Sequence, residues 1–167
     1  MSETQTGVRV ALAREGAANV ATGLPVLDHL VGLLAQAGRF KLALEVAPER
    51  ADESVVAAGR ALGRAVGERL DAGHGWALVP ADEALALASL ERAGDPRLVT
   101  NVDFSGQRVG GLDTDVPSRF LEELALSAGL NLHVRLVEGT DPQHVLAAIF
   151  KAVGAALGQA CRPLPEP

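Results

Sequence analysis

Few side chains in this chain of 167 residues are chemically reactive. The sequence contains four histidines and a single cysteine, Cys161. Cys161 lies near the end of the chain, and the sequence supplies no dedicated base that would activate its thiol. The glycine-rich segment 106–111 is followed by no lysine of the kind that a phosphate-binding loop requires. Neither feature therefore predicts a catalytic site.

Three histidines and one lysine each have a functional and a structural interpretation. His29 follows Pro25 at the start of a predicted helix, where it either contacts a ligand or packs against the helix start. His133 and His144 are donors that zinc and manganese accept together with carboxylates, or they are ordinary polar residues on a solvated face. Lys151, in the sequence Phe-Lys-Ala, either contacts a phosphate or is a surface lysine whose stem covers apolar neighbours.

The elements that would position these residues recur along the chain. Alternating apolar residues predict strands, and apolar residues three or four apart predict helices. In the first half these patterns predict strands over 7–12, 19–21 and 40–46 and helices over 25–38 and 55–70. In the second half they predict strands over 98–104 and 130–137 and helices over 117–129 and 141–161.

The two halves match when the sequence is shifted by 91 residues. Alanines and glycines of 57–67 then fall on those of 148–158, and Ala37-Gly38 falls on Ala128-Gly129. A match without gaps through two helices favours a tandem duplication, although helices rich in alanine and glycine can also match by chance. We expect one α+β domain over 1–167, made of two repeats, about 7–75 and 98–161, each a small β-sheet plus two helices.

Composition excludes several classes of protein. The 15 basic and 21 acidic side chains give a net charge of −6, and no basic run is present, which argues against nucleic-acid binding. One cysteine excludes a disulfide framework and a multi-cysteine zinc site. No apolar stretch is long enough to span a membrane, and residues 1–7 lack the pattern of a signal peptide. We therefore expect a soluble cytoplasmic protein.

Four segments together resemble one known family. Residues 22–30 read TGLPVLDHL, 80–85 read PADEAL, 129–134 read GLNLHV and 141–152 read DPQHVLAAIFKA. They are similar, in the same order, to signature segments of the imidazoleglycerol-phosphate dehydratase family. The resemblance implies that family's duplicated fold, and a hydro-lyase reaction of histidine biosynthesis that converts imidazole glycerol phosphate to imidazole acetol phosphate. It also implies a pair of manganese ions that hold the imidazole ring.

The first half departs from the metal ligands that the resemblance implies. The family has two adjacent histidines and a glutamate on the second helix of each half, where this chain has Asp52, Glu53 and Val56. A further histidine is expected at the position of Ala37. Valine and alanine cannot ligate a metal, and changes around the site cannot replace them.

The second half keeps part of the implied ligand set. Gln143 and Ala147 stand where the resemblance implies a histidine and the glutamate, while His133 and His144 remain. These two histidines, with Asp52 or Glu53 from a neighbouring subunit, would form at most a residual zinc or manganese site.

Several residues that the resemblance implies for catalysis and for phosphate binding are also replaced. The family's acid/base glutamate aligns with Gln5, which cannot exchange a proton near neutral pH. A phosphate-binding arginine is replaced by Asp95, and a pair of arginines by Ala72-Gly73. His29 and Glu83 remain as remnants of the catalytic set, and Lys151 as a remnant of the phosphate site.

The sequence therefore predicts a degenerate homologue that lacks the metal-dependent dehydratase activity and acts as a binding or regulatory paralogue. The alternative is an active hydro-lyase with a rebuilt site. We expect no cofactor, with manganese or zinc only under the alternative. Expected partners are a small phosphorylated or imidazole-like ligand and further copies of the chain, as a homotrimer or another small oligomer held by Ala-rich helix faces.

Overall fold

The structure is a computed structural model that describes residues 5–48, 50–103, 108–113 and 115–164. The end of the predicted strand 98–104 and the first residues of the segment 106–111 lie outside the described residues. The elements are β1 (Thr6–Leu12), β2 (Ala17–Ala21), α1 (Pro25–Gly38), β3 (Phe40–Val46), α2 (Ala51–Gly67), β4 (His74–Ala81), β5 (Ala84–Arg92), β6 (Arg97–Thr100), β7 (Arg108–Val109), β8 (Leu112–Asp113), α3 (Asp115–Ala128), β9 (Leu130–Glu138) and α4 (Pro142–Ala160).

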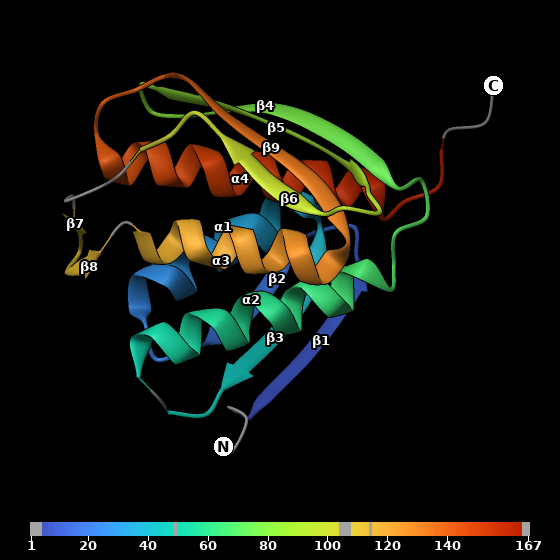
Figure 1. Cartoon of the computed structure of the whole chain (residues 1–167), viewed down its shortest axis with the longest axis horizontal. Helices are drawn as coiled ribbons and strands as arrows, with labels where there is room; N and C mark the ends of the chain where they lie inside the picture. Colours follow the sequence, from blue (N-terminus) through green and yellow to red (C-terminus); the bar gives the residue numbers. More distant parts are fainter. Residues whose placement is uncertain (1–4, 49, 104–107, 114, 165–167) are drawn as a thin grey trace.

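The four helices lie between two sheets (Figure 1). One sheet has the strand order β4-β5-β9-β6 and the other has the order β1-β3-β2. Along β3, Phe40, Leu42 and Leu44 are buried against the helices, whereas the residues between them are exposed. This period of two is what a strand with one covered face requires, and it places the apolar core inside the helix layer.

Three strands of each sheet have the same topology, which supports the predicted duplication. β1 pairs antiparallel with β3 as β5 pairs with β9, and β2 pairs parallel with β3 as β6 pairs with β9. The ends of the pairings also correspond, because Leu12 faces Phe40 and Arg92 faces Leu130. The predicted second repeat, which begins at residue 98, therefore omits β5, the counterpart of β1.

The spacing between equivalent residues is not constant. Helices α1 and α3 end in left-handed residues, Arg39 (φ 55°) and Gly129 (φ 70°), which are 90 residues apart. Each accepts a hydrogen bond at its carbonyl, from Ala13 and Ala93 respectively. The predicted match of Ala37-Gly38 with Ala128-Gly129 is thus wrong by one residue. For α2 and α4 the spacing of 91 holds, because the second half has one extra residue between the start of β9 and the start of α4.

Glycines bring the helices of the two halves into close contact. A Cβ at Gly63 of α2 would lie 2.7 Å from the carbonyl oxygen of Leu124 in α3. A Cβ at Gly154 of α4 would lie 2.1 Å from that of Leu34 in α1. Gly63 and Gly154 are 91 residues apart, and Leu34 and Leu124 are 90 apart. The two halves therefore pack on each other through equivalent helix pairs.

This packing corrects one expectation about self-association. The Ala-rich helix faces, predicted to hold copies of the chain together, are buried inside the chain. Ala58, Ala125, Ala152 and Ala156 have no exposed surface. Because both faces of the helix layer are covered by sheets, an interface with another copy has to use other surfaces.

The segment 74–92 forms a hairpin that the sequence patterns did not predict. β4 and β5 pair along eight residue pairs, from His74 with Glu91 to Ala81 with Ala84.

The single cysteine, Cys161, is buried just after α4, and burial raises the pKa of its thiol to about 11. Among the described residues no helix is long and apolar enough to cross a membrane.

Candidate functional site

The start of α1 is fixed by a buried threonine. Thr22 donates hydrogen bonds from its backbone N–H and its hydroxyl to Asp28 Oδ1. Pro25, in the first turn, has a φ that suits a helix start. This arrangement makes Asp28, in the sequence Leu27-Asp28-His29, a structural residue. It also places the exposed side chain of His29 on the first turns of α1.

The start of α4 carries the second group of site residues. Asp141 caps the helix, because its side chain accepts a hydrogen bond of 2.9 Å from the N–H of Gln143, and Pro142 follows it. His144, Ala147 and Lys151 are spaced by three and four residues, so they lie on one face of the helix.

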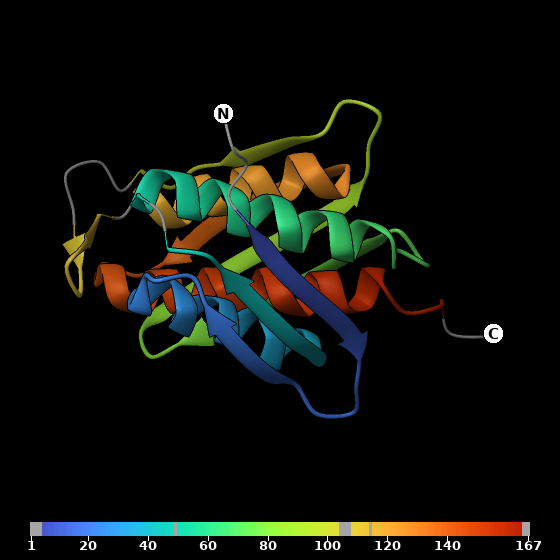
Figure 2. The ribbon, with the colours of Figure 1, turned by 90° about the horizontal axis from the view of Figure 1, so that it is seen from below.

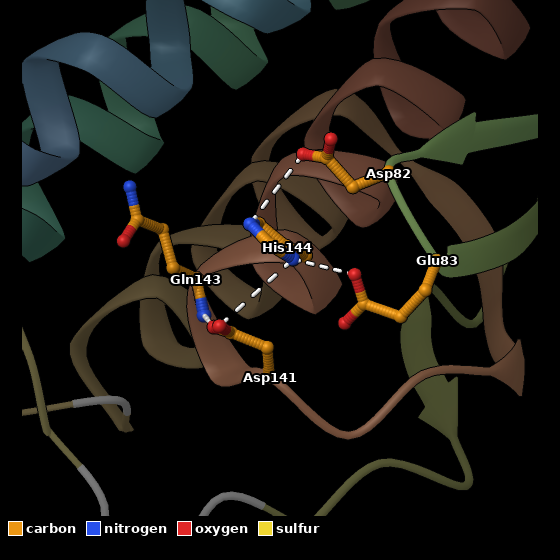
Figure 3. A network of polar contacts seen from close by, with 5 residues as sticks. All are labelled: Asp82, Glu83, Asp141, Gln143 and His144. Carbon is orange, nitrogen blue, oxygen red and sulfur yellow. Dashed lines mark hydrogen bonds and ion pairs between the residues drawn. The ribbon is translucent and has the colours of Figure 1, made fainter.

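The turn between β4 and β5 faces this helix start. Asp82 and Glu83 form a two-residue connection in which Asp82 is left-handed, with φ 52°. Aspartate tolerates this conformation better than most residues. The turn directs both carboxylates toward His144 (Figure 3).

These elements enclose a pocket of about 750 Å³. The pocket brings together five of the retained or replaced positions, namely His29, Gln143, His144, Ala147 and Lys151. The wall is completed by apolar residues of α1 and α4, by the β4–β5 turn and by Val109 and Gly110 of the β7–β8 hairpin. The pocket therefore combines an apolar wall with a small number of polar groups, as ligand sites usually do.

His144 lies among three carboxylates (Figure 3). Its Nδ1 is 2.6 Å from Glu83 Oε2, and its Nε2 is 3.4 Å from Asp82 Oδ2. Asp141 Oδ2 is 3.9 Å from Nδ1. Since a carboxylate only accepts, Nδ1 is the donor toward Glu83. With a carboxylate at each ring nitrogen, the arrangement favours the imidazolium form.

The charges of this pair are mutually stabilising. The hydrogen bond to Glu83 is the largest cause that raises the pKa of His144, although burial opposes it. The pKa of Glu83 is lowered, first by its own backbone N–H and then by the hydrogen bond to His144. The pair is therefore an ion pair over a wider range of pH than two isolated groups would be.

The other predicted ligand positions do not meet His144 within the chain. His133 is exposed on the outer face of the four-stranded sheet, where it lines a different pocket with His74 and Trp76. Asp52 and Glu53 lie in the first turn of α2, and Asp52 is 3.6 Å from Arg50 in an exposed ion pair. None of these residues lines the pocket around His144.

The residues present do not fit a pair of metal ions within one chain. Within the described ranges, no three histidine, cysteine, aspartate or glutamate side chains gather as metal ligands would. At His144, a metal would have to displace a carboxylate from a ring nitrogen. Val56, at the place of a glutamate ligand, is partly buried against the core. Ala147 lines the pocket but carries no donor atom.

Sequence reasoning missed Asp82 as a partner of His144. Its only signal was membership of the PADEAL segment, next to Glu83. The β7–β8 hairpin was missed as well, because its strands are two residues long and give no periodic pattern.

Comparisons with known proteins agree with the duplicated α+β fold and with the four signature segments. The family model described as imidazoleglycerol-phosphate dehydratase matches residues 22–157. The imidazoleglycerol-phosphate dehydratase of Desulforudis audaxviator (strain MP104C) is 37% identical over 168 residues, which are 95% of this chain and 86% of that protein. That of Heliobacterium modesticaldum (strain ATCC 51547 / Ice1) is also 37% identical, over 95% of this chain and 86% of its own length.

A solved structure agrees as well. The crystal structure of imidazoleglycerol-phosphate dehydratase from Staphylococcus aureus matches with a TM-score of 0.85 and 26% identity, and covers 96% of this chain and 95% of that chain. This chain belongs to the imidazoleglycerol-phosphate dehydratase family, a family of histidine biosynthesis, and the resemblance inferred from its sequence is confirmed.

Proposed function

We propose that this chain is a non-catalytic member of its family that binds a small phosphorylated or imidazole-like ligand as a regulatory or binding paralogue. The observation that supports this function is the pocket around His144. It keeps His29, His144 and Lys151, but Gln143 and Ala147 occupy the places of two metal ligands on the same helix face. Of the implied metal ligands in this pocket only His144 is thus retained, together with His29 and Lys151.

Lys151 gives the pocket a cationic group for an anionic ligand. A lysine ammonium binds phosphate as a point charge, without the two-pronged geometry of arginine. Asp82 and Glu83 carry negative charges, opposite to that of Lys151, but both side chains lie against His144. A phosphorylated ligand would place its phosphate at Lys151, with an imidazole-like ring against the apolar wall near His29.

The test compares turnover with binding. Purified protein with manganese should not dehydrate imidazole glycerol phosphate, whereas calorimetry should detect its binding. Lys151→Gln should weaken that binding, and the same change at the chain's other lysine, Lys41 on the opposite sheet, should not. Turnover on the order of 1 per second or more would contradict the proposal.

The alternative function is an active dehydratase with a rebuilt site. It is favoured by relatives that are named dehydratases and are 37% identical over 95% of the chain. If the first proposal is correct, Asp52→His, Glu53→His and Val56→Glu together should not restore activity, because Ala37 and Ala147 carry no donor atom and Gln143 still stands in place of a histidine. A second gene in the host with intact ligands would also favour a paralogue, and its absence would favour residual activity.

We further propose that the protein is cytoplasmic and forms a homotrimer or another small oligomer. With the Ala-rich helix faces buried, the outer face of the four-stranded sheet is the best candidate for the contact. Trp76, Leu78 and Val137 on this face are 62%, 50% and 53% exposed. Exposed apolar residues grouped on one face are typical of a surface that binds another protein.

A further inference from the structure

Each half of the fold carries a cation at an equivalent helix position. Figure 2 shows α2 beside α3 and α1 beside α4, and Arg60 of α2 and Lys151 of α4 are 91 residues apart. Across α2 and α3, Arg60 Nε lies 3.0 Å from Glu123 Oε2. The α1 counterpart of Glu123, at the spacing of 90, is Leu33. The first half therefore neutralises its cation with a carboxylate, whereas the second half has a leucine in that place.

Lys151 keeps its charge available in the pocket around His144. Within the described ranges, no carboxylate lies at ion-pair distance from its ammonium. An acidic residue in the same wall, Asp82, has its carboxylate 3.4 Å from His144 Nε2. An anionic ligand at Lys151 therefore does not compete with a carboxylate of the described chain.

The wall beside Lys151 is apolar where the chain departs from its family. Leu33 of α1 and Ala147 of α4 both line the pocket, and Leu30 lies one turn before Leu33. Ala147 stands where the resemblance implies a glutamate, so it removes a charge that would repel an anion. A hydroxylated ligand would lose hydrogen bonds to water against this wall, whereas an apolar ligand would gain from burial.

The β7–β8 hairpin covers the end of this wall at the start of α1. A Cβ at Gly110 would lie 2.8 Å from Cγ2 of Val26, and Val109 lines the pocket next to it. On this side the pocket is therefore bounded by apolar side chains and backbone, which again offer more to an apolar ligand than to a hydroxylated one.

We propose that Leu33 and Ala147 determine the class of ligand that the His144 pocket binds, namely a phosphate monoester whose body is an apolar ring or a short alkyl chain. The phosphate lies at Lys151, and the apolar body lies along Leu30, Leu33 and Ala147. This inference rests on the function proposed for the pocket and adds the chemistry of the ligand's body. The pocket volume of about 750 Å³ is within the range of small-molecule sites.

Three probes separate the charge of such a ligand from its body. Phenyl phosphate carries a phosphate on an apolar ring, glycerol phosphate carries the same charge on a hydroxylated body, and phenol carries the ring alone. Calorimetry on the full chain measures the affinity for each probe. We expect phenyl phosphate to bind about tenfold or more tightly than either of the others.

Leu33→Glu gives Lys151 the kind of partner that Arg60 has in the first half. It should weaken the binding of phenyl phosphate about tenfold or more, because the new carboxylate competes for the ammonium. Leu33→Gln, which has the same size without the charge, should weaken it less. Arg60→Gln, which removes the equivalent cation of the first half, should leave the affinity unchanged.

Ala147→Glu applies the same test from α4 in case Leu33→Glu fails to fold. Ala147 and Lys151 are four residues apart on one helix face, where a glutamate and a lysine pair and stabilise a helix. This variant should also weaken the binding of phenyl phosphate, and its uncharged control, Ala147→Gln, should weaken it less. Urea unfolding should show no loss of stability for Ala147→Glu relative to the parent.

Three results would overturn this inference without contradicting the proposed function. The first is that glycerol phosphate binds as tightly as phenyl phosphate, which would mean that the apolar wall does not contact the ligand. The second is that imidazole glycerol phosphate binds while phenyl phosphate does not. The third is an equal effect of Leu33→Glu and Leu33→Gln. The proposed function fails separately if the protein dehydrates imidazole glycerol phosphate, a result that leaves the order of the three probes unchanged.

Discussion

At the scale of single residues, the contact between Glu83 and His144 controls the charge of the pocket. The two side chains come from residues 61 positions apart and meet at 2.6 Å. Asp82 lies at the other ring nitrogen, 3.4 Å away. His144, with its raised pKa, therefore stands where the family resemblance implies a metal ligand, and the carboxylates around it balance the charge of its imidazolium form.

Replacing Glu83 tests which group raises the pKa of His144. In Glu83→Gln the hydrogen bond to a negative charge is lost, so the pKa of His144 should fall toward its ordinary value of 6.5. Titration of the imidazole carbon protons by NMR measures the shift. Glu91→Gln, which removes a carboxylate from the outer face of the sheet, should leave the pKa of His144 unchanged. An equal shift in both variants would rule out a specific contact.

The same pair predicts how stability depends on pH. A raised pKa of His144 contributes stability that is complete below 6.5 and is lost as the pH rises through its folded-state pKa. A lowered pKa of Glu83 contributes stability that is complete above 4.5 and is lost as the pH falls through its folded-state pKa. The contribution of the pair is therefore greatest between about 4.5 and 6.5. Urea unfolding of the parent and of Glu83→Gln should differ most in that window and converge on either side.

At the scale of elements, the fold depends on backbone contact between helices of the two halves. Gly154 lies on α1 so closely that an added methyl would meet the carbonyl oxygen of Leu34 at 2.1 Å. Gly63 has the equivalent contact between α2 and α3, with 2.7 Å to Leu124. Backbone atoms cannot move aside as a flexible side chain can, so these helices must separate if either glycine is enlarged.

Gly154→Ala should therefore destabilise the protein. Overpacking of this kind costs about 1–3 kcal/mol or more, and it outweighs the gain of up to about 1 kcal/mol in helix propensity. Gly32→Ala is the matched control in α1, because an added Cβ there has no atom within 4 Å. Thermal and urea unfolding should show loss of stability for the first variant and none for the second. Equal behaviour of the two would mean that α1 and α4 are not in backbone contact.

At the scale of the whole molecule, the Ala-rich helix faces are buried inside the chain, so self-association has to use exposed surfaces such as the outer faces of the sheets. Metal-ligand bonding can contribute on the order of 10 kcal/mol to an assembly that presents the ligands. The chain has lost most of the ligands that the resemblance implies, and the described residues form no three-ligand cluster. We therefore expect an assembly of this protein to be held by contacts other than metal bridges.

We expect an oligomer, a homotrimer or another small species, whose size does not change with EDTA or added manganese. Light scattering during size exclusion, with and without chelator, measures this directly. Trp76→Glu should dissociate the oligomer if the outer sheet face forms the contact, while Arg108→Glu on the β7–β8 hairpin should not. A large assembly that dissociates in EDTA would show that His133, His144, Asp52 or Glu53 binds a structural metal, and would favour the active enzyme.

The sequence alone determined the local elements and the family. Strand 40–46 agrees to the residue, because period-two patterning depends only on neighbours along the chain. The signature segments identified the family for a similar reason. Each is a short run whose residue types are fixed by a turn, a cap or a helix face, such as Thr22 and Asp28 at the start of α1.

The tertiary structure alone decided which of these residues meet. Glu83 and His144 are in contact while His133 lies on another surface, and nothing local to either histidine distinguishes them. The Ala-rich helices show the same limit. The sequence pattern of an apolar helix face is the same whether that face packs inside its own chain or on another copy. Contacts over 60 to 120 residues depend on how the two halves pack together, and a local sequence pattern carries no information about that packing.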